Sequence, residues 1–222
     1  MGDLHNVEIV QMGIVSYPET LELMKQLQQQ RIADEIPDTL LLLEHPEIVT
    51  IGPRARNDGI LPPNDYPTHA VDRGGGLTWH GPGQLVAYPI FKWDLEEEVS
   101  VAAIINFLEA WILKALEVSG IRGHRDERMQ GVWVDEKKIS SIGLSFLRWT
   151  SRHGFTVNLD TPYNRVEALA GCGLDSSTTT SLTQLGYTLE RQKLIEALLS
   201  TMEECIRRTP KHRYNFANDE PK

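Results

Sequence analysis

The stretch from residue 73 to residue 84 constrains this chain more than any other part of its sequence. It reads Arg-Gly-Gly-Gly-Leu-Thr-Trp-His-Gly-Pro-Gly-Gln and holds five of the 17 glycines in the chain. Three consecutive glycines weaken any regular element, but they suit a place where main chain must approach a ligand closely. We therefore expect the amides of residues 74–76 to be open to a ligand, with the charge of Arg73 beside them. The alternative is an ordinary glycine-rich hairpin in which His80 occurs by chance.

The spacing of this stretch excludes two common phosphate-binding motifs. No Gly-Lys-Ser or Gly-Lys-Thr follows the glycines, as a P-loop requires, and the Gly-x-Gly-x-x-Gly fingerprint of dinucleotide-binding proteins is absent. The two cysteines, Cys172 and Cys205, are too few for a disulfide scaffold and lack the spacing of a metal site. Cys205 falls in a helical pattern and is expected to be a small buried hydrophobe.

Length, charge and hydropathy predict one soluble domain. The 222 residues are 41% hydrophobic, which is enough for a sizeable core, and no apolar run reaches membrane-spanning length. The first residues lack the basic and apolar regions of a secretory signal, so we expect a cytoplasmic protein without a membrane partner. The net charge of -9 argues against nucleic acid as the partner. We place a single domain at residues 1–208 and a polar C-terminal tail at residues 209–222.

Short apolar runs separated by turn residues alternate with helical patterns along the chain. Strands are expected at residues 7–10, 39–43, 48–51, 68–72, 85–91, 131–134, 138–146 and 155–159, and helices at 16–33, between Ser100 and Gly120, and from Thr188 onward. The strand at 85–91 should pair with residues 76–80 across the Gly-Pro-Gly turn, and residues 54–67 should form a loop. Strands in hairpins with inserted helices predict an α+β fold, with a mixed β-sheet and flanking helices.

Two residues could carry nucleophilic chemistry, Cys172 and Lys138. Cys172 lies between two glycines that give access to its thiol, and the hydroxyl-rich run after it could begin a helix, whose dipole favours a thiolate. Lys138 begins a predicted strand; near the cysteine, it would favour the thiolate and move protons. The alternatives are a thiol without a role and a solvated lysine at a strand edge. His80 and His153 could pair with the cysteine or hold loops together.

Seven short blocks occur together along about two thirds of the chain. They are Leu-Glu-His-Pro at 43–46, the glycine stretch at 73–84, Gly-Val-Trp at 131–133, Lys-Lys-Ile-Ser-Ser-Ile-Gly at 137–143, His-Gly-Phe-Thr-Val-Asn at 153–158, Cys-Gly-Leu at 172–174 and Thr-Ser-Leu at 180–182. In this order they resemble the lipoyl(octanoyl) transferases, also called octanoyl-acyl-carrier-protein:protein N-octanoyltransferases. Two positions depart from the family pattern: Trp79, where the family often has Tyr or Phe, and Gly171, where the nucleophile usually follows Pro. Both bear on acyl-chain preference rather than on the reaction.

The resemblance implies the fold of the biotin and lipoate protein ligase catalytic domains, so that residues 1–208 would form an octanoyltransferase catalytic domain. It also implies that Cys172 and Lys138 are catalytic, in the first step of endogenous lipoate synthesis. The implied acyl-binding residues are Arg73, Gly74, Gly75, Gly76, Leu77, Thr78, Trp79, His80, Ser141, Ile142, Gly143, His153, Gly154 and Phe155. Neither ATP nor a metal nor another cofactor is implied, because a donor thioester is already activated.

The implied partners are octanoyl-acyl carrier protein as donor, and as acceptors the lipoyl domains of 2-oxoacid dehydrogenases and the glycine cleavage H protein. These proteins are usually acidic, whereas this chain itself carries a net charge of -9. We therefore expect a local basic face drawn from Arg122, Arg125, Arg128, Lys137, Arg148 and Arg152. Two other functions stay open: an ATP-dependent lipoate or biotin protein ligase on the same fold, and a non-catalytic relative that binds lipoylated or acylated proteins.

Overall fold

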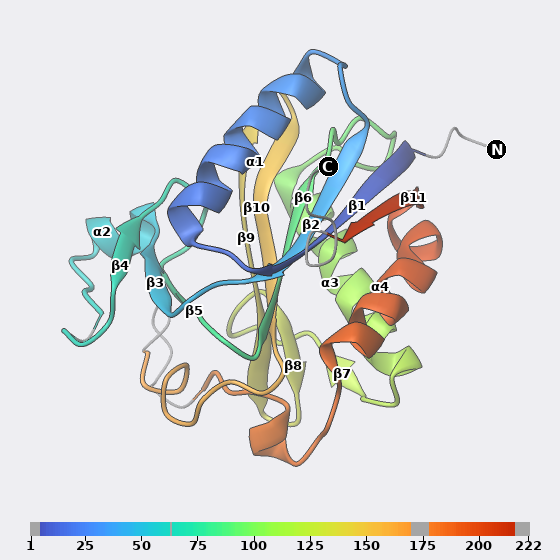
Figure 1. The fold of residues 1–222 in the computed structure, drawn as a ribbon. Helices are drawn as coiled ribbons and strands as arrows, with labels where there is room; N and C mark the ends of the chain where they lie inside the picture. The colour runs from blue at the N-terminus through green and yellow to red at the C-terminus, as the bar shows by residue number, and fades with distance from the viewer. Residues whose placement is uncertain (1–4, 63, 170–177, 216–222) are drawn as a thin grey trace.

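Two sheets form the framework of the molecule (Figure 1), which a computed structural model describes over residues 5–62, 64–169 and 178–215. Over these residues the main sheet has eight strands in the order β11-β1-β2-β6-β10-β9-β8-β7. Its strands are β1 (His5–Ile14), β2 (Asp38–Glu44), β6 (Gln84–Ile90), β7 (Gly123–His124), β8 (Val132–Val134), β9 (Lys137–Leu147), β10 (Thr150–Asn158) and β11 (Arg208–Asn215). The smaller sheet has the order β4-β3-β5, with β3 at Ile48–Ile51, β4 at Thr68–Ala70 and β5 at Leu77–His80.

The main sheet is mixed. β1 runs parallel to both β2 and β11, whereas each neighbouring pair from β2 to β7 is antiparallel. The predicted hairpin between β8 and β9 is present, with Asp135 at its turn in a positive-φ conformation. The expected α+β fold with a mixed sheet and flanking helices is therefore confirmed.

Helices cover both faces of the main sheet. The α-helices of the described residues are α1 (Tyr17–Ile32), α2 (Pro53–Asn57), α3 (Val101–Val118) and α4 (Arg191–Ile206), and a short 3-10 helix lies at Thr183–Leu185. The short helix α2 lies beside the small sheet rather than on the main one (Figure 1). In Figure 1, α1 crosses one face of the sheet, while α3 and α4 lie together on the other. Leu40 and Leu42 of β2 join the core with α3 and α4, whereas Leu41 and Leu43 join the core with α1. Burial on both faces explains why this strand is a continuous apolar run.

The helix ends follow some sequence signals and depart from others. Ser100 Oγ accepts a hydrogen bond from the Ala103 amide at 3.1 Å, and Gly120 has a φ of 81° just after α3. This is the expected N-cap and the expected glycine stop. The short helix α2 forms inside the segment expected to be a loop, and α4 begins at Arg191 rather than directly after Thr188.

The predicted pairing of β6 with residues 76–80 is wrong. β6 pairs with β2 and β10 in the main sheet, whereas β5 pairs with β3 in the small sheet. The Gly83 carbonyl accepts hydrogen bonds from the amides of Leu159 and Asp160, each at 3.0 Å, and a Cβ at Gly83 would overlap the Asp160 carbonyl. The turn is therefore held against the end of β10, and the strands on its two sides enter different sheets.

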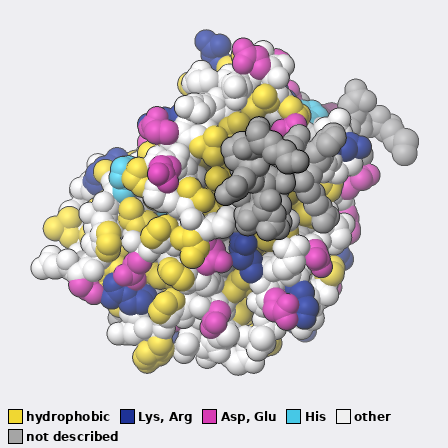
Figure 2. All heavy atoms as spheres, in the orientation of Figure 1, with side chains coloured by type: hydrophobic (Ala, Val, Ile, Leu, Met, Phe, Trp, Pro, Cys, Tyr) yellow, Lys and Arg dark blue, Asp and Glu magenta, His cyan; other side chains and the backbone are white. Residues whose placement is uncertain are grey.

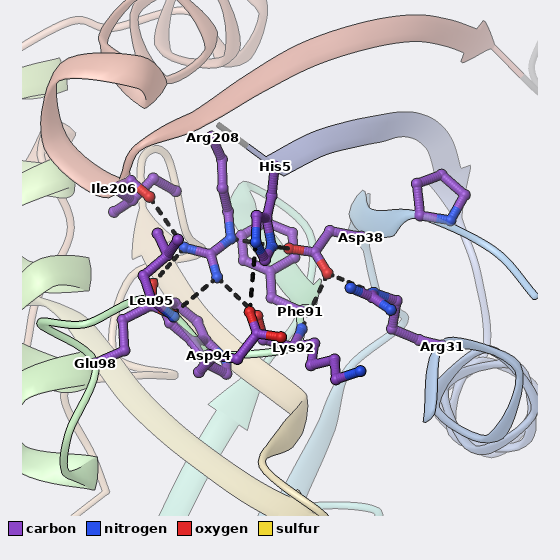
Figure 3. A network of polar contacts seen from close by, with 12 residues as sticks. His5, Arg31, Asp38, Phe91, Lys92, Asp94, Leu95, Glu98, Ile206 and Arg208 are labelled. Atoms are coloured by element: carbon purple, nitrogen blue, oxygen red, sulfur yellow. Dashed lines mark hydrogen bonds and ion pairs between the residues drawn. The ribbon is translucent and has the colours of Figure 1, made fainter. Parts of the chain in front are cut away.

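Residues 209–215, whose composition suggested a polar tail, lie in β11 at the edge of the main sheet. The pairing places His5 of β1 opposite Arg208, and Gln11 opposite Asn215. The Arg208 side chain is fully buried and donates hydrogen bonds to Asp38 and Glu98 (Figure 3). Strand pairing and this buried network together join the two ends of the described chain.

Candidate active site

A cavity of about 360 Å³ lies between the glycine stretch and strands β9 and β10. Residues 75–79 supply one wall, and Lys138, Ser141 and Ile142 of β9 supply another. Its other lining residues are Arg54, Gln84, Glu127, Arg128, Met129, Gln130, Thr156, Asn158, Val166, Leu169 and Thr179. The fold thus gathers Lys138 and half of the predicted acyl-binding residues around one space, although they come from distant parts of the sequence.

A smaller void of about 20 Å³ adjoins this cavity and shares Thr78, Ser141, Ile142 and Thr156 with it. The remaining residues around the void are Tyr17, Arg73, His80, Tyr88, Gly143, His153, Gly154 and Phe155. All the predicted acyl-binding residues except Gly74 therefore line one space or the other. The Gly74 amide instead donates a hydrogen bond to the Leu144 carbonyl at 2.9 Å.

Lys138 is buried, with 5% of its surface exposed, and is not the solvated strand-edge lysine that the sequence left open. Its amide donates to the Thr178 carbonyl at 2.9 Å, and its carbonyl accepts from the Thr180 amide at 3.0 Å. The side chain passes close to Gly131, where a Cβ would lie 2.7 Å from Lys138 Cε. The Gly131 amide donates to Glu109 Oε1 of α3 at 2.8 Å. Helix α3 therefore fixes the glycine that leaves room for the lysine.

Arg73 braces the glycine stretch. Its guanidinium is buried and donates to the carbonyls of Gly74, Gly76 and Thr50, and to Thr50 Oγ1, over distances between 2.8 and 3.1 Å. The expectation that the amides of residues 74–76 are all open to a ligand is wrong for Gly74, because its amide is bonded to Leu144. The loop is shaped by its own arginine, so its main chain is already arranged before any ligand binds.

His80 belongs to a chain of hydrogen bonds that ends beside Lys138. Gln84 Nε2 donates to Asn158 Oδ1 at 2.9 Å, so Gln84 Oε1 is left to accept from His80 Nδ1, also at 2.9 Å. His80 Nε2 then accepts from Thr50 Oγ1 at 3.2 Å. Burial lowers the pKa of His80 well below its usual value, so the ring is neutral. Asn158 in turn donates to the Thr180 carbonyl at 2.9 Å, next to the segment that pairs with Lys138.

His153 is also buried and hydrogen-bonded. Its Nε2 lies 2.9 Å from Asp72 Oδ1, so Nε2 donates to the carboxylate and Nδ1 accepts from the Tyr17 hydroxyl at 3.3 Å. Burial lowers the pKa of His153, although Asp72 acts in the opposite direction. Both candidate histidines therefore hold the cavity walls together, as one of the two sequence interpretations proposed.

Cys172 lies outside the described residues, and its partnership with Lys138 stays a prediction. The described chain reaches the cavity on both sides of this segment, because Leu169 and Thr179 both line it. Cys205, in contrast, is half-buried in α4 and packs against the core, where burial raises the pKa of its thiol. It therefore packs as a small hydrophobe, as expected, but it is half-buried rather than buried.

At least three of the six charged side chains of the expected basic face form ion pairs. Arg125 donates to Glu109 at 2.8 Å, Arg128 donates to Asp126 at 2.6 Å, and Arg152 pairs with Asp72. On the face drawn in Figure 2, acidic and basic side chains are interspersed. A docking face for acidic partners therefore stays a prediction. Among the residues that the structure describes, no group of three or more His, Cys, Asp or Glu side chains could hold a metal ion.

The architecture is that of the lipoate and biotin protein ligases. The chain is similar to the crystal structure of lipoate-protein ligase A bound with ATP, with a TM-score of 0.68 at 12% identity, covering 95% of this chain and 88% of that one. It is also similar to the biotin protein ligase from Aquifex aeolicus, with a TM-score of 0.53 at 13% identity, covering 92% of this chain and 70% of that one. The fold expected from the resemblance is confirmed.

The family follows from sequence similarity. Residues 16–203 match the lipoyl protein ligase A/B catalytic domain. An octanoyltransferase from Cereibacter sphaeroides is 36% identical over 205 residues, covering 86% of this chain and 94% of that protein. The chain belongs to the lipoyl protein ligase A/B catalytic domain family, and its resemblance to the octanoyltransferases is confirmed.

Sequence reasoning missed several residues of the site. Gln84 and Asn158 could have been found, because each is the last residue of a block that carried the resemblance. The cavity loop at residues 127–130 gave no signal of a pocket, because its spacing is not unusual and its Arg128 was expected only as part of a basic face. Tyr17 and Tyr88 also gave none, because each lies where a helix or strand needs an apolar side chain for its core.

Proposed function

We propose that this chain is an octanoyltransferase that works through an acyl-cysteine intermediate. It takes an octanoyl group from octanoyl-acyl carrier protein onto Cys172 and passes it to a lysine of a lipoyl domain, in the first step of endogenous lipoate synthesis. The observation that carries this proposal is the cavity in which buried Lys138 meets the glycine stretch. The relative named octanoyltransferase, similar over most of both chains, supports the same reaction.

The reaction has two acyl transfers. In the first, the Cys172 thiolate attacks the carbonyl carbon of the donor thioester. A C–S bond to Cys172 forms and the C–S bond to the carrier breaks, and the carrier leaves as a thiol after taking a proton from the Lys138 ammonium, which becomes a neutral amine. In the second, the acceptor lysine attacks the same carbon, the amide C–N bond forms, and the Cys172 thiolate is restored. Lys138 accepts the proton that the attacking amine loses. No ATP is needed, because one thioester replaces another of similar energy.

The two adjoining spaces suit a saturated acyl chain. Such a chain offers only apolar surface, and burying seven methylene and methyl groups at about 0.8 kcal/mol each contributes roughly 5 kcal/mol before ordering costs. Ile142 and Leu77 supply apolar walls, and the glycine main chain lets the ligand approach closely. The acyl-binding role of the predicted residues is part of this proposal.

The donor, the acceptors and a cytoplasmic location are the finer parts of the proposal. Lipoyl-domain acceptors agree with the family, and the 2-oxoacid dehydrogenases and the glycine cleavage H protein are the acceptors we propose. No helix in the described part of the chain is long and apolar enough to cross a membrane. An ATP-dependent ligase on this fold is the second candidate, but the relative at 36% identity favours the transferase. Lipoate-protein ligase A, at 12% identity, supports only the fold.

The proposal predicts octanoyl transfer without ATP. Purified protein is mixed with octanoyl-acyl carrier protein and an unmodified lipoyl domain, and the intact mass of the lipoyl domain is measured. We expect a mass increase of one octanoyl group, located on the acceptor lysine by peptide mapping. A parallel reaction with free octanoate and ATP should leave the lipoyl domain unmodified. Modification only in the ATP reaction would show a ligase instead.

Lys138→Met is expected to lower the rate of transfer to the lipoyl domain by about 10²–10⁴-fold, the usual contribution of a positioned acid–base group. Methionine keeps most of the volume of the buried side chain while it removes the amine. The rate is measured by intact mass over time, and thermal unfolding confirms that the variant folds. Lys193→Met is the control, because Lys193 is an exposed lysine of α4. A Lys138→Met rate within threefold of the wild type would contradict the assigned role.

A further inference from the structure

The small void beside the cavity has an unusual far wall of hydrogen-bonded rings. Tyr17, His80, Tyr88 and His153 surround it and are all buried. The Tyr17 and His80 rings are stacked with centroids 5.9 Å apart, and the Tyr88 and His153 rings meet edge to face at 6.4 Å. At about 20 Å³ the void has room for little more than one water molecule, so the four rings leave almost no free space at this end.

Both tyrosine hydroxyls of the wall have fixed partners. His45 Nδ1 lies 2.6 Å from the Val15 carbonyl and must donate to it, so His45 Nε2 accepts from the Tyr88 hydroxyl at 2.9 Å. His153 Nδ1 accepts from the Tyr17 hydroxyl, because its Nε2 donates to Asp72. Burial raises the pKa of both tyrosines and lowers the pKa of His45 to about 4, so all three side chains stay neutral.

We propose that Tyr17 and Tyr88 are specificity-determining residues that close the acyl pocket and limit the chain length it accepts. The inference rests on the proposed function and deepens it. An acyl chain attached near Lys138 runs past Thr78 and Ile142, which line both spaces, and ends at this wall. A longer chain must push a ring aside and break a buried hydrogen bond, which costs more than burying one further methylene gains.

The wall should therefore favour octanoyl over longer saturated chains. One methylene too many in a tightly walled apolar pocket typically changes kcat/KM by about 10–200-fold. Shortening the chain leaves space unfilled but breaks no hydrogen bond, so hexanoyl should be tolerated better than decanoyl. We therefore expect kcat/KM to fall more when the acyl chain is lengthened than when it is shortened.

The test compares acyl carrier protein loaded with hexanoyl, octanoyl or decanoyl groups, with transfer to a lipoyl domain measured as kcat/KM. Tyr17→Leu removes the ring that starts α1, and we expect it to raise the ratio of decanoyl to octanoyl transfer at least about tenfold. Tyr88→Leu is the second variant and should act in the same direction. Tyr187→Leu is the control, because Tyr187 is a half-buried tyrosine that packs against the main core and lines neither space. Its ratio should match the wild type.

An unchanged ratio in both wall variants, with octanoyl transfer still measurable and each variant folded by thermal unfolding, would overturn the inference and leave the proposed function standing. Absence of octanoyl transfer in the folded wild-type protein would overturn the proposed function and this inference with it. A raised ratio in either wall variant, but not in Tyr187→Leu, supports the inference.

Discussion

Replacing Cys172 by alanine is expected to abolish octanoyl transfer, with a loss of at least about 10⁴-fold, because the acyl group then has no covalent carrier on the enzyme. Wild-type protein incubated with octanoyl-acyl carrier protein alone should gain the mass of one octanoyl group, and peptide mapping should locate it at position 172. The alanine variant should show neither the adduct nor the transfer. Serine at this position should also be inactive, because its hydroxyl is a far weaker nucleophile than a thiolate at neutral pH.

The second cysteine of the chain makes a matched control for this experiment. Cys205 is half-buried in α4, and burial raises the pKa of its thiol, so it should not be acylated. Cys205→Ala should keep the octanoyl adduct and the wild-type rate. An adduct that persists in Cys172→Ala but disappears in Cys205→Ala would reverse the assignment. Transfer that survives Cys172→Ala and requires ATP would point to the ligase instead.

The sequence predicted the order and type of most elements because their signals are local. The buried strand β2 shows itself as an uninterrupted apolar run, and α3 is bounded by a capping serine and a stopping glycine. Pairing between distant strands is not encoded locally. The strands around the Gly-Pro-Gly turn were expected to form a hairpin, but the contact between Gly83 and Asp160 decides their separation, and it joins residues far apart in sequence. Strand β11 was expected to be part of a polar tail for the same reason: its pairing with β1, at the other end of the chain, leaves no local signal in its polar residues.

In the candidate site, too, some features could be predicted from the sequence and others depend on contacts between distant residues. Short blocks identified the family, and through it the residues that the structure gathers around two adjoining spaces. The blocks could not show what those residues do to one another. Arg73 was expected to present its charge to a ligand, whereas its donors brace the carbonyls of its own loop. His153 is hydrogen-bonded to Tyr17 and to Asp72. Both partners lie far from it in the sequence, and only the fold brings the three side chains together.

The largest effect on stability is expected from Arg208, whose five donor hydrogens all have acceptors (Figure 3). Its Nε donates to Asp38 Oδ2 at 2.9 Å, while Nη1 donates to Glu98 and to the Ile206 carbonyl, and Nη2 donates to Glu98 and to the Lys92 carbonyl. Arg208 and Asp38 are almost fully buried. The network therefore links β2, β11 and the loop after β6 without contact with solvent.

Arg208→Met should lower the free energy of unfolding by about 3–5 kcal/mol, because it leaves the buried Glu98 carboxylate without its cation and removes one of the cations around buried Asp38, which keeps Arg31 at 2.7 Å. Denaturant unfolding measures the loss. Arg207→Met is the matched control: Arg207 is 37% exposed, pairs with the exposed Glu97, and should cost no more than about 1 kcal/mol. Equal losses in the two variants would contradict the assignment of the network as a main support of the fold.

We also expect the difference in unfolding free energy between wild type and Arg208→Met to depend on pH. Burial raises the pKa of Asp38, but the neighbouring His5, whose Nδ1 lies 3.6 Å from Asp38 Oδ2, and the charge of Arg208 outweigh it, so the pKa lies below the ordinary value of 3.8. A carboxyl group with a lowered pKa in the folded state contributes its stability above its unfolded pKa and loses it as the pH falls further. The difference in unfolding free energy between wild type and Arg208→Met should therefore have its largest value at pH 7, and it should decrease as the pH falls below about 4. A difference that stayed constant from pH 7 to pH 3 would mean that the charges of Asp38 and Glu98 contribute nothing. Arg208 would then stabilise the fold through its hydrogen bonds to the Ile206 and Lys92 carbonyls and its packing over Phe91 and Trp93.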